Sequence, residues 1–398
     1  MIRNISVGID VGSSATRVVV GEFLKGEKNP KIIGVGEAPS LGIRHGYITD
    51  SDSALISVKN ALNLAERSSG IKIKHAFVSI NGVSLKSVIN GGTAVISKAN
   101  GEVTNLDINK ALQDCEDNLN LNNRKVIQVY PISFRLDGKD VLGRLDGMHG
   151  TKLEAKALFV TYSIQHLEDL LGIITRAGVE VIDVIAAPIT LANIILSEKQ
   201  KIVGVALVDI GAETTSLAVF ENGLLISVRT FSIGSCDITN DIALGFKIPL
   251  EKAESLKVGS EVLGNFSSPK ADQFRAEKKK LDEIIEARLC DIFESIENNL
   301  KKIKRSELLP AGVIFVGGGA NIKGLEELAK STLKLPSSIG TTEIFGNSKT
   351  KLRELSWQTA ISLLISGRDN RAYSEDSFRN LFKDLKNTIK SSMKQLMP

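Results

Sequence analysis

Cysteine is scarce in this sequence, and its scarcity excludes two kinds of site. The 398 residues contain Cys115, Cys236 and Cys290, which are far apart and lack the spacing of a CxxC or histidine-paired zinc site. Their odd number and wide separation also argue against a disulfide framework, so we expect three reduced, structural thiols. The four histidines show no metal-ligand spacing either.

Long hydrophobic runs and a strong net charge are also missing. No run is long enough to span a bilayer, and Met1 leads directly into a strand-like stretch without the apolar region of a signal peptide. We therefore expect a protein that stays in the cytoplasm. A formal net charge of +4 is too small for this length to predict a protein coated in nucleic acid.

Aliphatic residues are plentiful, whereas aromatic residues make up only 5% of the chain. This profile is typical of a soluble α/β protein built from Val- and Ile-rich strands and ordinary helices. A chain of 398 residues exceeds what one hydrophobic core usually organises, so two or more lobes are expected.

A short pattern, D-x-G-x-x-x-T, occurs twice about half a chain apart, at residues 10–16 and 209–215. Both copies are flanked by β-branched runs, which predicts two hairpins whose turns direct backbone N–H groups and hydroxyls towards one point. One copy alone would be an ordinary hairpin, but two copies suggest facing clamps around a single nucleotide. The candidate nucleotide-binding residues of these two hairpins are Asp10, Gly12, Ser13, Ser14, Thr16, Asp209, Gly211, Thr214 and Thr215.

The aspartate before each turn has a different predicted role. A carboxylate repels phosphate, but it can hold the water shell of a Mg²⁺ ion that bridges phosphates. We therefore predict that Asp10 and Asp209 contact Mg²⁺ through water.

A glycine-rich turn follows a third strand-like run at residues 311–316. Gly317, Gly318 and Gly319 would let the backbone approach a flat ligand such as adenosine, and Asn321 is a plausible helix N-cap. The segment matches neither the P-loop spacing nor the dinucleotide-binding fingerprint. Its position after the second hairpin suggests that it belongs to the same site.

Together these elements resemble the actin, Hsp70 and sugar-kinase superfamily, and longer stretches are similar to the FtsA family in particular. The longest match runs from Ile33 to Asp50, with the glycine and serine spacing of a family signature, and further matches lie at residues 79–82, 130–138, 147–154 and 234–243. The resemblance covers nearly the whole chain. It implies an α/β, actin-like two-lobed ATPase fold whose duplicated sheet-and-helix lobes enclose a cleft for ATP and Mg²⁺.

The resemblance also implies a division of the chain. Lobe 1 (1A) would comprise residues 1–83, 160–195 and 356–366, with an inserted domain (1C) at 84–159; lobe 2 would comprise 2A at 196–228 and 306–355 and 2B at 229–305; a linker at 367–377 and a helix at 378–398 would follow. Alternating apolar residues, a helix-like stretch and a further strand in 84–159 predict a compact β-α-β unit. In the family this insertion contacts neighbouring molecules and late division proteins.

Three further positions bear on the nucleotide. The resemblance assigns Glu254 and Lys257, which share one helical face, to the ribose and adenine. Glu213 departs from the family pattern, and a carboxylate in a phosphate turn must point outward or meet a cation. No Glu or Gln stands beside Pro188, where hydrolytic relatives orient the attacking water, so we expect ATP binding with at most slow hydrolysis.

The C-terminal residues combine an apolar stripe with clustered positive charge. Polar residues 367–377 predict a flexible tether, and apolar residues then recur at helical spacing with lysines on other faces. This pattern indicates an amphipathic helix that binds an anionic membrane surface, although a docked terminal helix would have the same pattern. The candidate membrane residues are Phe378, Leu381, Phe382, Leu385, Ile389, Met393, Lys383, Lys386 and Lys390.

The resemblance therefore implies an ATP-binding cell division adaptor. Its subunits would polymerise, bind the C-terminal tail of the tubulin-like ring protein FtsZ, and anchor the division ring to the inner face of the cytoplasmic membrane as a peripheral protein. A PilM-like pilus assembly protein is the alternative within the fold. A sugar or acid kinase of the same superfamily is a further alternative, but it would need a base carboxylate facing a substrate pocket, and none is evident in the sequence.

Overall fold

The computed structural model describes residues 4–24, 29–141, 143–259, 271–342 and 354–373. The predicted membrane-targeting helix at 378–398 lies outside the described residues, as does the end of the predicted linker at 374–377. None of the helices in the described part of the chain is long and apolar enough to cross a membrane.

The first sheet contains the first D-x-G hairpin. Its five strands, in spatial order, are β11 (Glu180–Ala186), β6 (His75–Ile80), β1 (Asn4–Val11), β2 (Ala15–Phe23) and β3 (Lys31–Pro39). β1, β2 and β3 form an antiparallel meander, whereas β6 and β11 continue the sheet in parallel from β1. The parallel strands therefore end at the same edge as the turn of the hairpin.

Helix α1 (Ser51–Ser69) covers this sheet and explains part of the family signature. Its N-cap is Asp50, whose side chain accepts hydrogen bonds from two backbone N–H groups. The helix lies directly on β3, where Cβ atoms built on Gly34 and Gly36 would come within 3 Å of its backbone. These two glycines are therefore needed for close helix–sheet packing.

The second sheet repeats the arrangement of the first. Its strands β16 (Ser337–Ile339), β15 (Val313–Val316), β12 (Val205–Ile210), β13 (Thr215–Glu221) and β14 (Leu224–Phe231) lie side by side in that order. β12, β13 and β14 form the antiparallel meander, and β15 and β16 run parallel to β12. The duplication seen in one short sequence pattern thus extends to the topology of two whole sheets.

Helices and short strands complete the two lobes. In the first lobe they are β4 (Ile43–Arg44), β5 (Tyr47–Ile48), α3 (Ile164–Arg176) and α4 (Ala187–Ile195). In the second they are α5 (Glu198–Val203), α6 (Ser235–Phe246), α7 (Leu250–Lys257), α8 (Ala271–Lys302), η2 (Gly318–Asn321) and α9 (Leu325–Leu333). Two large apolar clusters form the cores. One spans the first sheet, the inner strands of the insertion and one face of the second sheet, and the other lies on the opposite face of the second sheet beneath α8 and α9.

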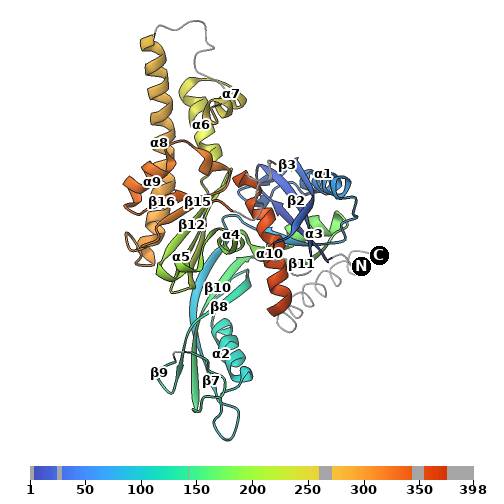
Figure 1. Cartoon of the computed structure of the whole chain (residues 1–398), viewed down its shortest axis with the longest axis vertical. Helices are drawn as coiled ribbons and strands as arrows, with labels where there is room; N and C mark the ends of the chain where they lie inside the picture. The colour runs from blue at the N-terminus through green and yellow to red at the C-terminus, as the bar shows by residue number, and fades with distance from the viewer. Residues whose placement is uncertain (1–3, 25–28, 142, 260–270, 343–353, 374–398) are drawn as a thin grey trace.

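The insertion has its own sheet, which is joined to that of the second lobe (Figure 1). It consists of β7 (Lys86–Val95), α2 (Asn105–Asp117), β8 (Arg124–Leu136), β9 (Lys139–Asp140) and β10 (Lys152–Ser163), with a small core beneath α2. A pair between Lys86 and Arg229 joins β7 to β14 and produces a nine-stranded sheet. The insertion therefore contacts both lobes, because its strand β10 leads directly into α3 of the first.

The chain returns to the first lobe through η4 (Leu355–Trp357) and α10 (Gln358–Tyr373), which packs on β1 and α4. The prediction of a tether beginning at residue 367 is wrong for 367–373, which continue α10. Extending an existing helix adds one hydrogen bond per residue at little entropic cost, so a helix that begins in the core can continue even through the weak helix formers Gly367, Asp369 and Asn370.

Candidate functional site

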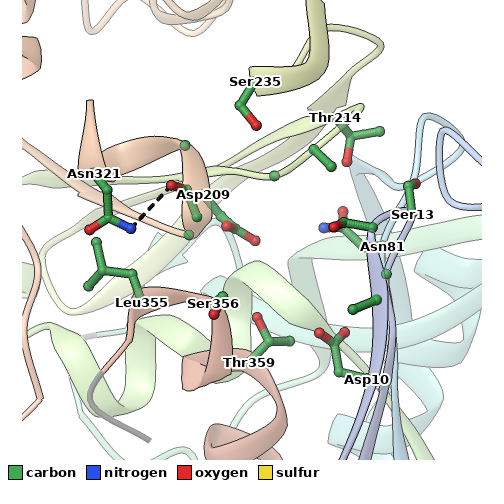
Figure 2. A pocket seen from close by; sticks show the side chains of 18 of the residues that line it. Asp10, Ser13, Asn81, Asp209, Thr214, Ser235, Asn321, Leu355, Ser356 and Thr359 are labelled. Atoms are coloured by element: carbon green, nitrogen blue, oxygen red, sulfur yellow. Dashed lines mark hydrogen bonds between the residues drawn. The ribbon is translucent and has the colours of Figure 1, made fainter. Parts of the chain in front are cut away.

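A cleft of about 290 Å³ lies between the two lobes, and its lining comes from both (Figure 2). The ends of β1 and β12, both hairpin turns and the glycine-rich turn after β15 all contribute to it. Because equivalent parallel strands end at this point in each lobe, residues far apart in the sequence meet here. The predicted residues that line it are Asp10, Gly12, Ser13, Ser14, Asp209, Gly211, Thr214, Glu254, Lys257, Gly317, Gly318, Gly319 and Asn321.

The two hairpin turns have the same geometry. In the first, the N–H of Gly12 donates to the carbonyl of Ala15 at 3.2 Å, and in the second the N–H of Gly211 donates to the carbonyl of Thr214 at 2.8 Å. A Cβ added to Gly12 or Gly211 would lie 3.1 Å or 3.0 Å, respectively, from the carbonyl oxygen that closes its turn. The turns therefore face the cleft as two equivalent loops, as expected for a pair of phosphate clamps.

Thr16 and Thr215, the last residues of the two patterns, do not reach the cleft. Both are fully buried at the start of the returning strands. The hydroxyl of Thr16 lies 3.1 Å from that of Ser40, and the hydroxyl of Thr215 donates to the carbonyl of Ile233 at 2.8 Å. The prediction that they bind phosphate is wrong, because the pleat turns these side chains into the lobes, where they hold the hairpins to adjacent segments.

The two aspartates lie in the cleft in poorly solvated surroundings (Figure 2). The hydroxyl of Ser79 donates to Asp10 at 2.6 Å. Burial raises the pKa of Asp10, while the bond from Ser79 and the charge of Arg17 lower it. Burial raises the pKa of Asp209 to about 7, and the charge of Asp10 contributes to that rise.

This pair of carboxylates suits a cation that neutralises them. Among the described residues there is no group of three or more His, Cys, Asp or Glu side chains that could hold a metal ion. Mg²⁺ commonly needs only one or two protein carboxylates, because waters and substrate phosphates complete its octahedral shell. Asp10 and Asp209 therefore fit Mg²⁺ that arrives together with a nucleotide.

The glycine-rich turn packs against the end of β12. Gly317 has φ of +83°, and a Cβ there would lie 2.2 Å from a carboxylate oxygen of Asp209, so this position requires glycine. A Cβ on Gly318 would instead meet nothing within 4 Å, although the residue lines the cleft. Gly318 therefore offers an open backbone surface to a ligand.

Asn321 lines the cleft but does not cap a helix. It ends the short η2, where its side-chain amide donates to the carbonyl of Gly318 at 3.2 Å (Figure 2). The following helix α9 begins later, after Gly324, which has a left-handed conformation. The N-cap prediction is wrong because the glycines form a 3₁₀ turn of their own before α9 starts.

Glu254 and Lys257 form an ion pair at one side of the cleft. The Lys257 ammonium lies 2.7 Å from the Glu254 carboxylate and donates to the carbonyl of Ser235 and the hydroxyl of Thr239. The Lys257 side chain is only 6% exposed, which excludes an ordinary surface ion pair. The carboxylate is about half exposed and remains accessible to a polar ligand.

Glu213 points away from the cleft and meets the first lobe. One carboxylate oxygen lies 2.7 Å from Nε of Arg44, and the other accepts a 2.7 Å hydrogen bond from the backbone N–H of His45. Nδ1 of His45 also lies 3.0 Å from the carbonyl oxygen of Glu213. The carboxylate therefore links the second hairpin turn, in one lobe, to the β4–β5 hairpin of the other.

Asn81 is a cleft residue that the sequence did not single out. It follows β6, and β6 holds the same place in the first sheet as β15 holds in the second. Its side-chain oxygen accepts hydrogen bonds from the hydroxyl of Ser216 at 2.6 Å and the N–H of Gly82 at 2.8 Å. The run Ser79–Gly82 stands out in the sequence only as a family match, and the shared strand order shows that it holds the place in the first lobe that the glycine-rich turn holds in the second.

Other cleft residues come from segments without a recognisable pattern. Arg17 lies on β2 directly opposite Asp10, and its guanidinium is held by Glu37 at 2.8 Å. Ser356 and Thr359 reach the cleft from η4 and α10 (Figure 2). Pro188 is the second residue of α4, and none of the residues of α4 lines the cleft.

Family models match two parts of the chain. The model described as "Cell division protein FtsA" matches residues 206–362, and one described as "SHS2 domain inserted in FTSA" matches residues 82–161. The chain is 30% identical over 369 residues to the "Cell division protein FtsA" of Bacillus subtilis, covering 90% of this chain and 82% of that protein. It is 27% identical to the protein of that name from Pseudomonas aeruginosa, covering 91% and 88%.

Solved structures with the same fold are more distant in sequence. The fold matches the "PilM-PilN type IV pilus biogenesis complex" with a TM-score of 0.65 and 15% identity, covering 91% of this chain and 98% of that one. It also matches the ethanolamine utilization protein EutJ from Carboxydothermus hydrogenoformans with a TM-score of 0.53 and 15% identity, covering 92% and 90%. At these identities the likeness concerns the two-lobed fold alone.

Proposed function

The chain belongs to the FtsA family of actin-like cell division proteins, and from this we propose that it is an ATP-dependent adaptor that links the division ring to the membrane. The observation that carries the nucleotide part of this proposal is the cleft itself. Two equivalent turns and one open glycine-rich turn converge there from both lobes.

Each part of the cleft suits one part of Mg-ATP. The backbone N–H groups and hydroxyls at Ser13, Ser14 and Thr214 would bind the phosphates, and Asp10 and Asp209 would hold the water shell of Mg²⁺. The open backbone of the glycine-rich turn would lie against the adenosine. The Glu254 carboxylate is free enough to accept hydrogen bonds from ribose hydroxyls, while the buried Lys257 positions it.

Turnover of the bound nucleotide is expected to be slow. The segment around Pro188 carries no Glu or Gln that could orient an attacking water, and α4 lies outside the cleft lining. We therefore propose that ATP acts mainly as a structural ligand that holds the lobes together. Subunits closed in this way would assemble into filaments through the insertion and the two lobes.

The membrane and ring contacts rest on the sequence and the family. The stripe of apolar residues and lysines in 378–398 supports a peripheral membrane anchor on the cytoplasmic face at the division site. Membership of the FtsA family supports binding of the FtsZ C-terminal tail through the second lobe and of late division proteins through the insertion. A single basic amphipathic helix gives reversible binding, which polymerisation would strengthen.

Calorimetric titration of Mg-ATP tests the central claim. We expect Asp209→Ala to weaken binding at least about tenfold, corresponding to a loss of about 1.4 kcal/mol. Gly318→Val should weaken it as well, because its side chain would occupy free space in the cleft. Gly172→Val is the matched control, since Gly172 also has nothing within 4 Å but does not line the cleft. Unchanged binding in both cleft variants would refute the assignment.

A further inference from the structure

The joint between the insertion and the second lobe carries an unusual set of charges. The insertion strand β7 meets β14 through the pair Lys86 and Arg229, which are directly opposite each other. On the other side of β7, Lys86 is opposite Thr161 of β10. Directly opposed residues of antiparallel strands have side chains on the same face, and like charges in such a pair are destabilising. The sheet is therefore joined at a point where two cations repel.

A third cation, Arg124, lies beside Lys86 and Thr161. The guanidinium of Arg124 donates through Nε to the hydroxyl of Thr161 at 3.0 Å and through Nη2 to its carbonyl at 2.9 Å and to the carbonyl of Ser84. These bonds fix the charge of Arg124 beside Lys86. We call Lys86, Arg124, Thr161 and Arg229 the junction row.

No described carboxylate neutralises the junction row. None of the ion pairs among the described residues includes any of its three cations. The charge of Arg124 lowers the pKa of Lys86, with smaller contributions from burial and from Arg229. The repulsion therefore remains uncompensated within the part of the chain that the structure describes.

The row lies on a face that two helices cover only in part. Arg229 is opposite Leu217, which is buried in the core beneath α8, and Thr161 is two residues from Phe159, which is buried in the core beneath α2. Figure 1 shows α8 and α2 at opposite ends of the molecule. Arg229 is exposed, while Lys86 and Arg124 are half-buried, so the row is accessible in the strip of sheet between these helices.

We propose that the junction row is a docking site for an acidic peptide segment of a partner protein. Two or more carboxylates would pair with Lys86 and Arg229, and the fixed charge of Arg124 would add attraction without moving. A half-buried row on a pleated sheet suits an extended segment, whose alternate side chains can reach the sheet surface, better than a flat membrane surface. The site is separate from the nucleotide cleft and goes beyond the adaptor function proposed above.

Binding of an acidic segment at the junction row would also stabilise the joint between the insertion and the second lobe. The neutralised pair would no longer repel across the joint, so the insertion would be held more firmly to the second lobe. A partner that carries such a segment would therefore stabilise one arrangement of the surfaces that the insertion offers to neighbouring molecules.

Fluorescence anisotropy of a labelled hexaglutamate peptide with the full-length protein tests the proposal. The variant Lys86→Gln with Arg229→Gln should bind the peptide at least about tenfold more weakly than the parent at low salt. The control changes Lys139 and Lys156 to Gln, which removes the same charge from exposed lysines elsewhere on the same sheet. Equal loss in both variants, or no loss in the first, would show that the row is not a site.

Two further measurements distinguish a peptide site from a structural or membrane-binding role of the row. Because the row repels itself, the Lys86 and Arg229 variant should melt no lower than the parent; a clearly lower melting temperature would make the row a structural feature. The full-length Phe382→Glu protein, whose tail is disabled, should not bind phosphatidylglycerol vesicles through the row; binding that Lys86→Gln abolishes would assign it to membrane. Mg-ATP titration should be unchanged in all row variants, which keeps this test independent of the cleft.

Discussion

Replacing Glu213 distinguishes two roles for a carboxylate in the hairpin turn that we propose binds phosphate. If it faced bound phosphates at about 5 Å, each pair of charges would cost about 3 kcal/mol at an effective dielectric of about 20. Removing it would then tighten ATP binding more than about a hundredfold. The structure places it elsewhere, on Arg44 and the N–H of His45, so we expect Glu213→Ala to leave ATP affinity nearly unchanged.

The same substitution should instead weaken the contact between the lobes. A hydrogen bond from an N–H group to a carboxylate contributes about 1.5–3 kcal/mol. The ion pair adds about 0–1 kcal/mol, because the Arg44 side chain is 66% exposed. His45 has φ of +49°, a conformation that costs free energy and that this bond helps to hold. Glu213→Ala should therefore lower the free energy of unfolding by about 2–4 kcal/mol.

Urea denaturation and calorimetry on the same samples measure both effects. Glu213→Gln is the informative companion, because its amide oxygen can still accept from His45 while the charge is lost. It should keep more than half of the stability that the alanine variant loses. Hundredfold tighter ATP binding by either variant, or an unfolding curve of Glu213→Ala that overlays the parent, would refute the assignment of this carboxylate to the lobe contact.

Three other outcomes are expected. Since the folded-state pKa of Asp209 is raised to about 7 from its ordinary value of 3.8, the unliganded protein should lose stability as pH rises from about 4 to 7, and Asp209→Asn should flatten this dependence in urea titrations. Phosphate release should stay well below the roughly 1–100 per second of kinases, even when filaments form; a kinase-like rate would mean that a side chain of the cleft acts as a catalytic group. Phe382→Glu should abolish flotation with liposomes without lowering the melting temperature. The double variant Lys383→Gln with Lys390→Gln should weaken flotation mainly on anionic liposomes at low salt. Retained flotation of Phe382→Glu, or a lower melting temperature of that variant, would mean that the tail is a docked structural helix.

Local sequence was enough to predict the hairpins and the glycine-rich turn. The β-branched runs around residues 10–16 and 209–215 favour strands, and a glycine in each turn permits the tight reversal, so these features depend on neighbours in the chain. The repeat also predicted duplicated lobes. The structure shows the same strand order in both sheets and brings most of the predicted residues to one cleft.

Other features depended on which surfaces meet. The alternation of side chains along a strand does not tell which face of a hairpin is buried. The sequence therefore predicts that Thr16 and Thr215 face the nucleotide, whereas they lie buried inside the lobes. Helix α10 continues past residue 366, where the sequence predicts a linker, because its first turns pack in the core. Asn81 lies at the cleft because β6 pairs in parallel with β1, and sequence spacing does not encode this pairing.

The sequence by itself determined the family, the two D-x-G hairpin turns and the duplicated lobes, because these follow from backbone propensity and residue spacing along a short stretch of chain. Only the tertiary structure decided that Glu213 turns outward to the β4–β5 hairpin and that Lys86 stands opposite Arg229. Both arrangements depend on contacts between segments that are far apart in the sequence. These contacts form only when the lobes and the insertion pack together, so no local sequence pattern predicts which charged side chains will be neighbours.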